Sequence, residues 1–354
     1  MSKKAIIAMS GGIDSSVAAF LMKEKGFDCI GATMKLYDND DIMISREKTC
    51  CSLDDIEDAR SVANRLSMPY YVFNFKDEFK EKVIDKFIAT YENGGTPNPC
   101  IDCNRYLKFR RLFQKMKELG FDYVVTGHYA KVEEKDGWFY LKKGEDASKD
   151  QSYVLYSLKQ EQLSHIIFPL GVYSKTEIRK SAEENNFLNA RKKDSQDICF
   201  VPDGDYAEFI ERYLGKTYPK GNFVDVNGNV LGEHQGIIRY TNGQRKGLGV
   251  AFGKPMYVAD KNIDDNTVTL CTNDELFSKE LTANDFNWLI PNPAKEIKCS
   301  ARVRYNMREQ PAAAYILDNG NVKVVFDEPQ RAITKGQAVV LYDGETLLGG
   351  GTII

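Results

Sequence analysis

The segment AIIAMSGGIDSSVAAFL, residues 5–21, decides the fold of the first half of the chain. It begins with an apolar run typical of a buried strand and ends with Val17, Phe20 and Leu21 on one face of a helix. Between them lies a turn of small residues, SGGIDSS at 10–16. Glycines let a backbone approach an anion, and the following helix points its positive end at the turn. The segment predicts a strand, an anion-binding turn and a helix.

The same alternation of strand and helix continues for more than a hundred residues. The patterns predict strands at 29–37, 70–75 and 123–129, and helices at 52–66, 77–91, 104–119 and 174–187. Such alternation predicts a parallel sheet with helices on both faces, whose ligands bind beyond the carboxyl ends of the strands. The opening turn, Met34 and the TGHYA sequence at 126–130 would share that edge of the sheet.

The pattern of the sequence changes after about residue 215. Short β-rich runs are now separated by turns of Gly, Asn and Asp, such as DNGN and DGET. We therefore predict three domains: an α/β catalytic domain at 1–210, a small central domain at 211–280, and a C-terminal β-barrel at 281–354.

Composition narrows the class of protein. The 354 residues carry a net charge of −3, which does not argue for nucleic-acid binding but leaves local basic patches open. The sequence lacks an apolar run of about 18 residues, so no membrane span is expected. The first residues lead directly into a strand without a signal-peptide pattern, which predicts a cytoplasmic protein. Structural disulfides are disfavoured in that compartment.

The opening turn lacks the lysine that reaches the β- and γ-phosphates in the common nucleoside-triphosphate loop. Its glycines and serines suit a pyrophosphate that is held while chemistry occurs at the α-phosphate. Asp14 is unusual beside an anion, and its carboxylate predicts a bound Mg²⁺. The alternative is a plain strand–helix turn without a ligand.

Three cysteines are candidates for chemistry. Cys100 and Cys103 form a C-x-x-C pair at the start of a helix, and Cys199 lies far from them in the sequence. They predict either sulfur transfer through a persulfide and a resolving thiol, or a [4Fe–4S] cluster with one open iron. A structural zinc site, completed by Cys50 or Cys51, is the third alternative.

The reactivity and the burial of the cysteines can also be predicted. A helix N-terminus lowers the pKa of a thiol, and Lys108 follows within two turns, so we expect Cys100 and Cys103 to be nucleophilic. Three other cysteines stand in strand-like apolar contexts and are expected in the core: Cys29, Cys271 and Cys299. The pair Cys50–Cys51 is expected to be a spectator.

Motifs over nearly the whole chain resemble, in order, those of the bacterial tRNA-specific 2-thiouridylase family. They are SGGIDSS at 10–16, NPCIDCN at 98–104, TGHYA at 126–130, KDQSY at 149–153, DICF at 197–200, GEHQGIIRYTNGQRKGLGV at 232–250, ARVRYN at 301–306 and TKGQAVVLY at 334–342. The first of them also resembles the loop of the ATP-pyrophosphatase superfamily, whose catalytic domain is adenine nucleotide alpha-hydrolase-like.

The resemblance implies an ATP-dependent sulfurtransferase that adenylates the 2-carbonyl oxygen of the wobble uridine (position 34) in tRNAs for Lys, Glu and Gln and replaces it with sulfur. Cys199 would carry a persulfide supplied by a sulfur-relay protein or a cysteine desulfurase, and Cys103 would be its partner nucleophile. The implied ATP-binding residues are Ala8, Met9, Ser10, Gly11, Gly12, Ile13, Asp14, Ser15, Met34 and Gly127.

The resemblance also implies contacts with tRNA and a monomeric protein. The implied tRNA-binding residues are His128, Lys149, Asp150, Gln151, Arg304, Tyr305 and Gln337. For His128 the alternative is a satisfied polar residue inside the fold.

One departure from the family pattern keeps the mechanism open. Cys100 stands where many family members have an aspartate, so the [4Fe–4S] alternative through Cys100, Cys103 and Cys199 remains. Two other functions also remain: a same-fold ligase that adenylates a small metabolite for attack by ammonia, and a non-catalytic RNA- or zinc-binding module.

Overall fold

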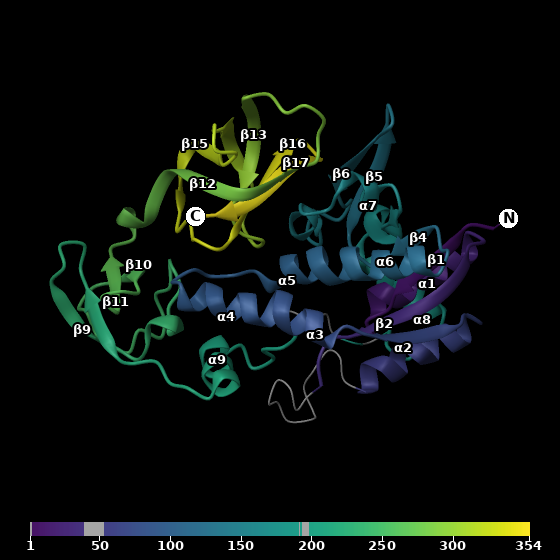
Figure 1. The fold of residues 1–354 in the computed structure, drawn as a ribbon, viewed down its shortest axis with the longest axis horizontal. Helices are drawn as coiled ribbons and strands as arrows, with labels where there is room; N and C mark the ends of the chain where they lie inside the picture. The colour runs from purple at the N-terminus through teal and green to yellow at the C-terminus, as the bar shows by residue number, and fades with distance from the viewer. Residues whose placement is uncertain (1, 39–52, 191, 193–197) are drawn as a thin grey trace.

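The computed structural model describes residues 2–38, 53–190, 192 and 198–354. Cys50, Cys51 and the helix start predicted at residue 52 lie outside these residues. Figure 1 shows an α/β sheet at one end of the molecule and a small β-sheet at the other. A β-barrel lies above the long helices that run between them. The α/β part, the small central sheet and the β-barrel therefore follow one another along the chain in the predicted order.

The N-terminal sheet has five parallel strands in the order β3-β2-β1-β4-β7. The strands are β1 (Lys4–Ala8), β2 (Asp28–Lys35), β3 (Tyr70–Asn74), β4 (Tyr123–Val125) and β7 (Ile166–Ile167). This arrangement confirms the predicted parallel α/β domain. The short edge strand β7 is an addition, because two apolar residues are too short a pattern to predict.

Helices cover both faces of this sheet, as its alternating connections require. They include α1 (Ile13–Glu24), α2 (Leu53–Arg65) and α8 (Lys175–Glu184) on one face, and α6 (Leu112–Glu118) on the other. Ile7 of β1 packs in one apolar cluster with Val17 and Ile178. Ile6, one residue earlier, points to the opposite face and packs with Leu112. Strand β1 is therefore buried on both sides, and its carboxyl end is fixed.

Two helices carry the chain between the sheet and the other domains. The first consists of α3 (Lys76–Phe79), η1 (Lys80–Ile84) and α4 (Asp85–Glu92), and the second of α5 (Pro99–Asp102), η2 (Cys103–Arg111) and α6. The middle of each, η1 and η2, is π-helical. The second helix begins five residues before the predicted start, because Asn98 caps it and Pro99 occupies its first position.

The central domain is a four-stranded sheet in the order β10-β11-β8-β9. Its strands are β8 (Gly221–Val224), β9 (Val230–His234), β10 (Tyr257–Asn262) and β11 (Thr267–Cys271). Helix α9 (Tyr206–Leu214) leads into this sheet. Phe223, Val258 and Leu270 are buried in one apolar cluster with residues of the helix α3–α4, so the central domain packs directly on the N-terminal domain.

The C-terminal domain is an antiparallel barrel, as predicted. Its strands are β12 (Phe277–Trp288), β13 (Glu296–Arg302), β14 (Gln310–Ile316), β15 (Val322–Arg331), β16 (Ala338–Asp343) and β17 (Thr346–Ile353). Strand β12 pairs with both β15 and β17, which closes the six strands on themselves. Closure leaves no free edge among these strands.

A hairpin of the N-terminal half joins the barrel sheet. Strands β5 (Ala130–Lys135) and β6 (Trp138–Lys143) follow β4, in a stretch for which no strand was predicted. Strand β6 pairs with β17 at Thr346 and Lys142. The turn between the strands is Asp136–Gly137, with both residues at positive φ. An Asp-Gly pair between two short apolar runs is a strong hairpin signal, and it could have predicted these strands.

Short elements complete the described structure. They are η3 (Ser152–Leu155), α7 (Gln160–Leu163), η4 (Pro169–Val172), η5 (Ile237–Arg239) and η6 (Asp274–Leu276). Within the described ranges, no helix combines the length and the apolar character needed to cross a bilayer.

Candidate active site

The opening turn leaves β1 at Ala8 and enters α1 at Ile13. Gly11 has φ +74°, and a Cβ atom there would lie 2.4 Å from the backbone oxygen of Asp55 in α2. Only glycine meets both demands. Gly12 is the N-cap residue, and no side chain caps the helix. The first N–H groups of α1 therefore remain available to an anion.

Hydrogen bonds from serines and an asparagine stiffen the turn. The Ser10 N–H donates to Ser15 Oγ at 3.2 Å, and Ser15 Oγ donates to the Gly12 carbonyl at 3.0 Å. Asn189 Nδ2 donates to the Gly11 carbonyl at 2.8 Å and to Ser16 Oγ at 2.9 Å. The turn is thus preorganised without a ligand. The sequence analysis did not predict Asn189, which follows α8 by only a few residues.

Asp14 forms an ion pair that the sequence analysis did not foresee. Lys175 Nζ donates to both carboxylate oxygens of Asp14, at 2.7 and 2.8 Å, and the Tyr129 hydroxyl donates to one of them at 2.8 Å. Lys175 is 8% exposed. The turn therefore has a lysine beside it after all, brought from residue 175 by the fold.

One signal could have identified Lys175. It is the first residue of α8, directly after the capping residue Ser174. A cation is electrostatically unfavourable at a helix N-terminus. A lysine in that position, within a capping box, indicates that its charge has an acidic partner elsewhere in the fold.

The neighbouring strand ends complete the same edge of the sheet. A Cβ atom on Gly127 would lie 2.8 Å from the backbone carbon of Asp14, so the segment after β4 approaches α1 as closely as a glycine allows. Thr33 Oγ1 donates to the Met9 carbonyl at 2.6 Å. Met34 is half-buried and packs against two apolar clusters. The predicted ATP-binding residues thus come from three adjacent strand ends.

The cysteine helix carries Cys100 and Cys103 in its first two turns. The Cys100 N–H donates to the side chain of its N-cap residue, Asn98, at 3.2 Å. Cys100 is exposed, whereas Cys103 is half-buried. Cys103 and Cys199 both pack against the same apolar cluster, which contains Phe79. Neither forms a disulfide in the structure.

The expected lowering of the thiol pKa is wrong for both cysteines of the pair, because desolvation of the sulfur raises the pKa of Cys100 as well as that of Cys103. Burial raises the pKa of the Cys103 thiol to about 11, and the charge of Lys108 offsets this only in part. The helix N-terminus is a weak partial charge, and desolvation of a thiolate against an apolar cluster is the larger effect. The thiol of Cys103 therefore rests in its protonated form.

The other described cysteines occupy the contexts predicted for them. Cys29 and Cys271 are buried, and Cys299 is half-buried in the barrel. Burial raises the pKa of Cys29 to about 11 and that of Cys299 to about 12.

The described residues do not provide a ligand set for a metal. In this part of the chain, no group of three or more His, Cys, Asp or Glu side chains lies close enough to hold an ion. Cys100, Cys103 and Cys199 are all described, so they do not form a three-thiolate site for a [4Fe–4S] cluster in this conformation. We derive no step through such a cluster.

The residues predicted to bind tRNA after β4 are turned inward. His128 is 8% exposed and lies between the rings of Phe109 and Phe168, with Nδ1 2.7 Å from Thr126 Oγ1. Burial lowers its pKa well below the usual range, so the imidazole is neutral. This environment matches the alternative stated for His128, a polar residue whose hydrogen bonds are satisfied inside the fold.

Asp150 and Gln151 hold the chain rather than face solvent. The buried carboxylate of Asp150 accepts from the N–H groups of Gly144 and Ser152, each at 3.1 Å. Gln151 Oε1 accepts from the Tyr129 N–H at 3.0 Å. The hydroxyl group of the same tyrosine contacts the opening turn. Lys149, by contrast, is half-exposed.

Three other predicted tRNA-binding residues line one pocket of about 450 Å³ at the foot of the barrel. Its lining residues are Arg304, Tyr305, Asn306, Met307, Arg331, Ala332 and Gln337. Arg304 donates to the carbonyls of Asn242 and Ala332, at 2.9 and 3.1 Å, and so joins the barrel to the central domain. The pocket combines two guanidinium groups with an aromatic ring, which suits a nucleic acid.

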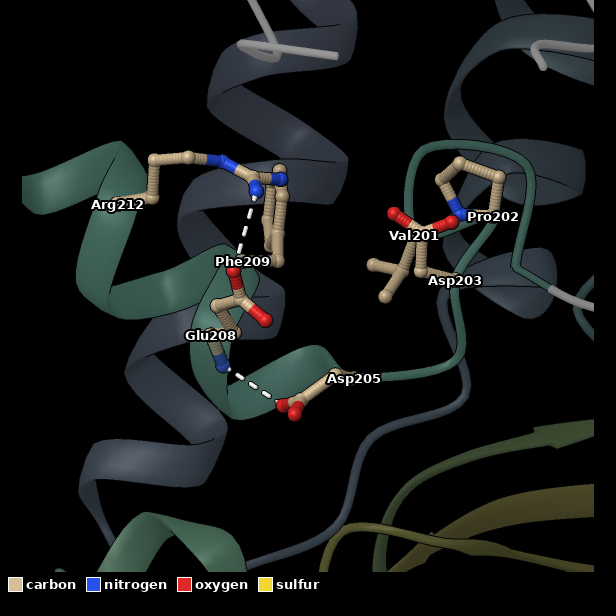
Figure 2. A pocket seen from close by; sticks show the side chains of 7 residues that line it. All are labelled: Val201, Pro202, Asp203, Asp205, Glu208, Phe209 and Arg212. Carbon is tan, nitrogen blue, oxygen red and sulfur yellow. Dashed lines mark hydrogen bonds and ion pairs between the residues drawn. The ribbon is translucent and has the colours of Figure 1, made fainter. Parts of the chain in front are cut away.

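The loop that carries Cys199 continues into α9 beside a much smaller hollow. Figure 2 shows Val201 and Pro202 on one side of it and Phe209 and Arg212 on the other. Asp205 caps α9 by accepting from the Glu208 N–H at 2.8 Å. The hollow measures about 10 Å³, which is room for about one water molecule. It is not a substrate site.

Most of the basic residues on the cysteine helix are already paired. The ion pairs are Arg105–Asp285, Arg111–Glu78, Lys115–Glu118 and Lys117–Glu161. Among the described residues, Lys108 and Arg110 form none. Most of the positive charge on this helix is therefore balanced by acidic neighbours. The charge of Lys108 lowers the pKa of the Cys100 and Cys103 thiols, although burial outweighs it.

This fold and site define a class: a three-domain protein with a parallel α/β domain, an anion-binding turn at its central strand, and two appended β domains. Family models match all three parts. A tRNA methyl transferase HUP domain matches residues 3–203, a tRNA methyl transferase PRC-barrel domain matches 207–272, and an aminomethyltransferase beta-barrel domain matches 278–353.

Curated relatives match over the full length of the chain. The chain is 51% identical to the tRNA-specific 2-thiouridylase MnmA of Clostridioides difficile (strain 630), over all of this chain and 98% of that one. It is 50% identical to the protein of the same name from Acetivibrio thermocellus, over 99% of each chain. The chain belongs to the tRNA-specific 2-thiouridylase MnmA family, as the sequence resemblance indicated.

Proposed function

We propose that this protein uses ATP to replace the 2-oxygen of the wobble uridine in tRNA with sulfur. One observation carries the proposal. A chain of this family combines a preorganised anion-binding turn with two cysteines, Cys103 and Cys199, that lie far from the turn in the sequence. The turn supplies activation by a nucleotide, and the cysteines supply sulfur. A ligase that uses ammonia would need the turn but neither thiol.

The first step is activation of the uridine. ATP binds with its phosphates against the turn of residues 10–15, and the 2-carbonyl oxygen of the uridine attacks the α-phosphorus. The bond from the α-phosphorus to the bridging oxygen breaks, and pyrophosphate leaves. The N–H groups of α1 and the ammonium of Lys175 stabilise the charge that develops on the leaving group. The oxygen at C2 is now part of a good leaving group, AMP.

Asp14 serves in this scheme as the anchor of Lys175. Its carboxylate accepts two hydrogen bonds from Lys175 and one from Tyr129. Such a carboxylate is poorly placed to be a dedicated ligand of Mg²⁺. Mg²⁺ is usually held by only one or two carboxylates together with substrate phosphates, so we propose that it enters with ATP and is bound largely by the phosphate oxygens.

The second step delivers sulfur. The terminal sulfur of a persulfide on Cys199 attacks C2 of the activated uridine, and AMP leaves. The Cys103 thiolate then attacks Cys199 Sγ. The S–S bond between Cys199 and the sulfur on C2 breaks, a Cys103–Cys199 disulfide forms, and the sulfur leaves with the electron pair as part of 2-thiouridine. The sulfane sulfur gains two electrons and the two thiols lose them. A cellular dithiol must reduce the disulfide, and a persulfide donor must reload Cys199, before the next turnover.

The protonated state of Cys103 fits this order of events. A thiol with a pKa of about 11 does not react prematurely with the persulfide at neutral pH. Lys108 offers positive charge that stabilises the Cys103 thiolate when it forms. Burial thus delays the second nucleophile until the first reaction has occurred.

The experiment is a single-turnover assay with purified protein, a tRNA transcript with a wobble uridine, ATP, Mg²⁺, a cysteine desulfurase and cysteine. We expect 2-thiouridine, pyrophosphate and AMP in equal amounts. Cys199→Ser should abolish thiolation, by a factor of at least about 10³, and still release pyrophosphate in the presence of tRNA. ATP turnover that does not depend on tRNA would contradict the proposal.

A further inference from the structure

All three domains meet at one short segment, residues 94–98, which lies between α4 and the cysteine helix. The segment is held from two sides by residues of the other domains. Its last residue is Asn98, the N-cap of the helix that carries Cys100 and Cys103. The direction in which this helix starts is therefore set by what holds the segment.

The barrel holds the segment through the loop at 335–337. Gln337 Nε2 donates to the Thr96 carbonyl at 2.8 Å and to the Pro97 carbonyl at 3.2 Å. The Thr96 N–H donates to the Lys335 carbonyl at 2.8 Å. Gly336 packs so closely that a Cβ atom there would lie 2.8 Å from Thr90 Cγ2. These contacts fix the backbone on both sides of the Thr96–Pro97 bond.

The central domain holds the same segment from the other side. Lys261 of β10 is 8% exposed, and its Nζ donates to the Tyr240 carbonyl at 2.8 Å and to the Gly95 carbonyl at 3.3 Å. The same ammonium lies 5.9 Å from the centroid of the Tyr91 ring in α4. Burying an amine is costly, so these contacts indicate a positional role for Lys261. The barrel and the central domain together enclose the segment.

We propose that Gln337 is a positioning residue for Cys103, and that it links occupancy of the pocket at the foot of the barrel to the placement of that thiol. The proposal rests on the proposed function. Gln337 lines the pocket together with Arg304 and Tyr305, yet its amide nitrogen is engaged with the segment before the cysteine helix. One side chain thus contacts both the pocket and the base of the helix.

The chemistry of the amide separates this role from a simple contact with tRNA. A glutamine amide has two N–H donors, and here the carbonyls of Thr96 and Pro97 accept hydrogen bonds from them. Only the Oε1 acceptor remains for the pocket, and an acceptor cannot bind a phosphate oxygen. A direct contact with the RNA backbone through this nitrogen would require both hydrogen bonds to break.

The test compares Gln337→Ala and Gln337→Glu with Lys335→Ala. Lys335 lies in the same loop, but its side chain is exposed and only its carbonyl contacts the segment, so its truncation is a matched control. Four quantities are measured: tRNA affinity, tRNA-dependent pyrophosphate release, the single-turnover rate of 2-thiouridine formation, and hydrogen exchange at the Thr96 amide.

We expect a split between the two chemical steps. Gln337→Ala should slow thiolation about tenfold, since small misplacement of a reacting group has effects of this size or larger. Gln337→Glu should slow it further, because a carboxylate would face two carbonyls. At saturating tRNA the loss of thiolation should exceed any loss of tRNA affinity or of pyrophosphate release, and exchange at Thr96 should accelerate. Lys335→Ala should match wild type in all four measurements.

Two results would overturn the proposal. Weaker tRNA binding with an unchanged thiolation rate at saturating tRNA would make Gln337 an ordinary tRNA contact. Equal losses in pyrophosphate release and thiolation, with a lower melting temperature, would make its role one of general stability. A wild-type protein that releases no pyrophosphate would instead contradict the proposed function. Exchange at Thr96 would then still decide whether Gln337 holds the segment, because that measurement does not depend on turnover.

Discussion

The opening turn at residues 8–15 and the segment at 94–98 both present groups for chemistry, but they are held in different ways. The turn is fixed by residues of its own domain: Asp55 limits Gly11, Asn189 binds its carbonyl, and Lys175 pairs with Asp14. The segment is fixed by Gln337 of the barrel and by a lysine of the central sheet. In the proposed mechanism, nucleotide activation is thus a property of one domain, and sulfur delivery depends on all three.

This difference has a functional consequence. A site built within one domain is complete as soon as that domain folds, whether or not tRNA is present. A site whose supports lie in the surfaces proposed to bind tRNA can respond to that binding. Keeping the reactive thiol under such control would prevent loss of sulfur to the wrong acceptor.

The largest effect on stability should follow Gly11→Ala, which attacks the turn from within its domain. Alanine would have to adopt φ +74° and place a Cβ atom 2.4 Å from a backbone oxygen of α2. Strain and overpacking together should cost about 4 kcal/mol of the free energy of unfolding. Urea denaturation monitored by circular dichroism measures this loss.

Gly12→Ala is the matched control for that variant. Gly12 has φ −87°, and the nearest atom to an added Cβ would be Ser10 Oγ at 3.4 Å, an ordinary contact. Its unfolding midpoint should stay close to that of wild type. Similar destabilisation by both substitutions would show that the turn is not limited by the approach of α2.

Lys175→Met should reduce tRNA-dependent pyrophosphate release about 10²-fold, because it removes the cation beside the turn and leaves the Asp14 carboxylate facing the phosphates. Lys180→Met on the same helix is the control. Lys180 is 75% exposed, and its ion pair with Glu184 lies at the surface, where such a pair contributes little. Rapid-quench measurement of pyrophosphate compares the two. An unchanged rate in Lys175→Met would remove Lys175 from the proposed first step.

The smallest effect concerns the reactivity of Cys103 toward iodoacetamide, measured by mass spectrometry in a Cys100→Ser background. Only the thiolate reacts, and burial raises the pKa of Cys103 to about 11. The thiolate fraction, and with it the alkylation rate, should rise about tenfold per pH unit from pH 7 to 10. A plateau near pH 7 would show that the helix N-terminus and Lys108 outweigh burial, as the sequence alone predicted.

The parts of the site that depend on local geometry were predictable. The turn at 10–16, the strand before it and the helix after it follow from residues adjacent in sequence, because glycine conformation and helix capping are short-range effects. The C-x-x-C pair at a helix start follows in the same way from Asn98 and Pro99. The hairpin β5–β6 was also readable from Asp136–Gly137, although its attachment to the barrel was not.

Local patterns were thus enough to predict an α/β domain with an anion-binding turn, a cysteine-bearing helix and a C-terminal barrel. The surroundings of these groups depend on the folded chain. It brought Lys175 to Asp14, buried His128 between two aromatic rings, and raised the pKa of Cys103. It also placed Gln337 on the carbonyls before the cysteine helix. Desolvation and ion pairing depend on neighbours that lie tens to hundreds of residues away, and no local pattern specifies them.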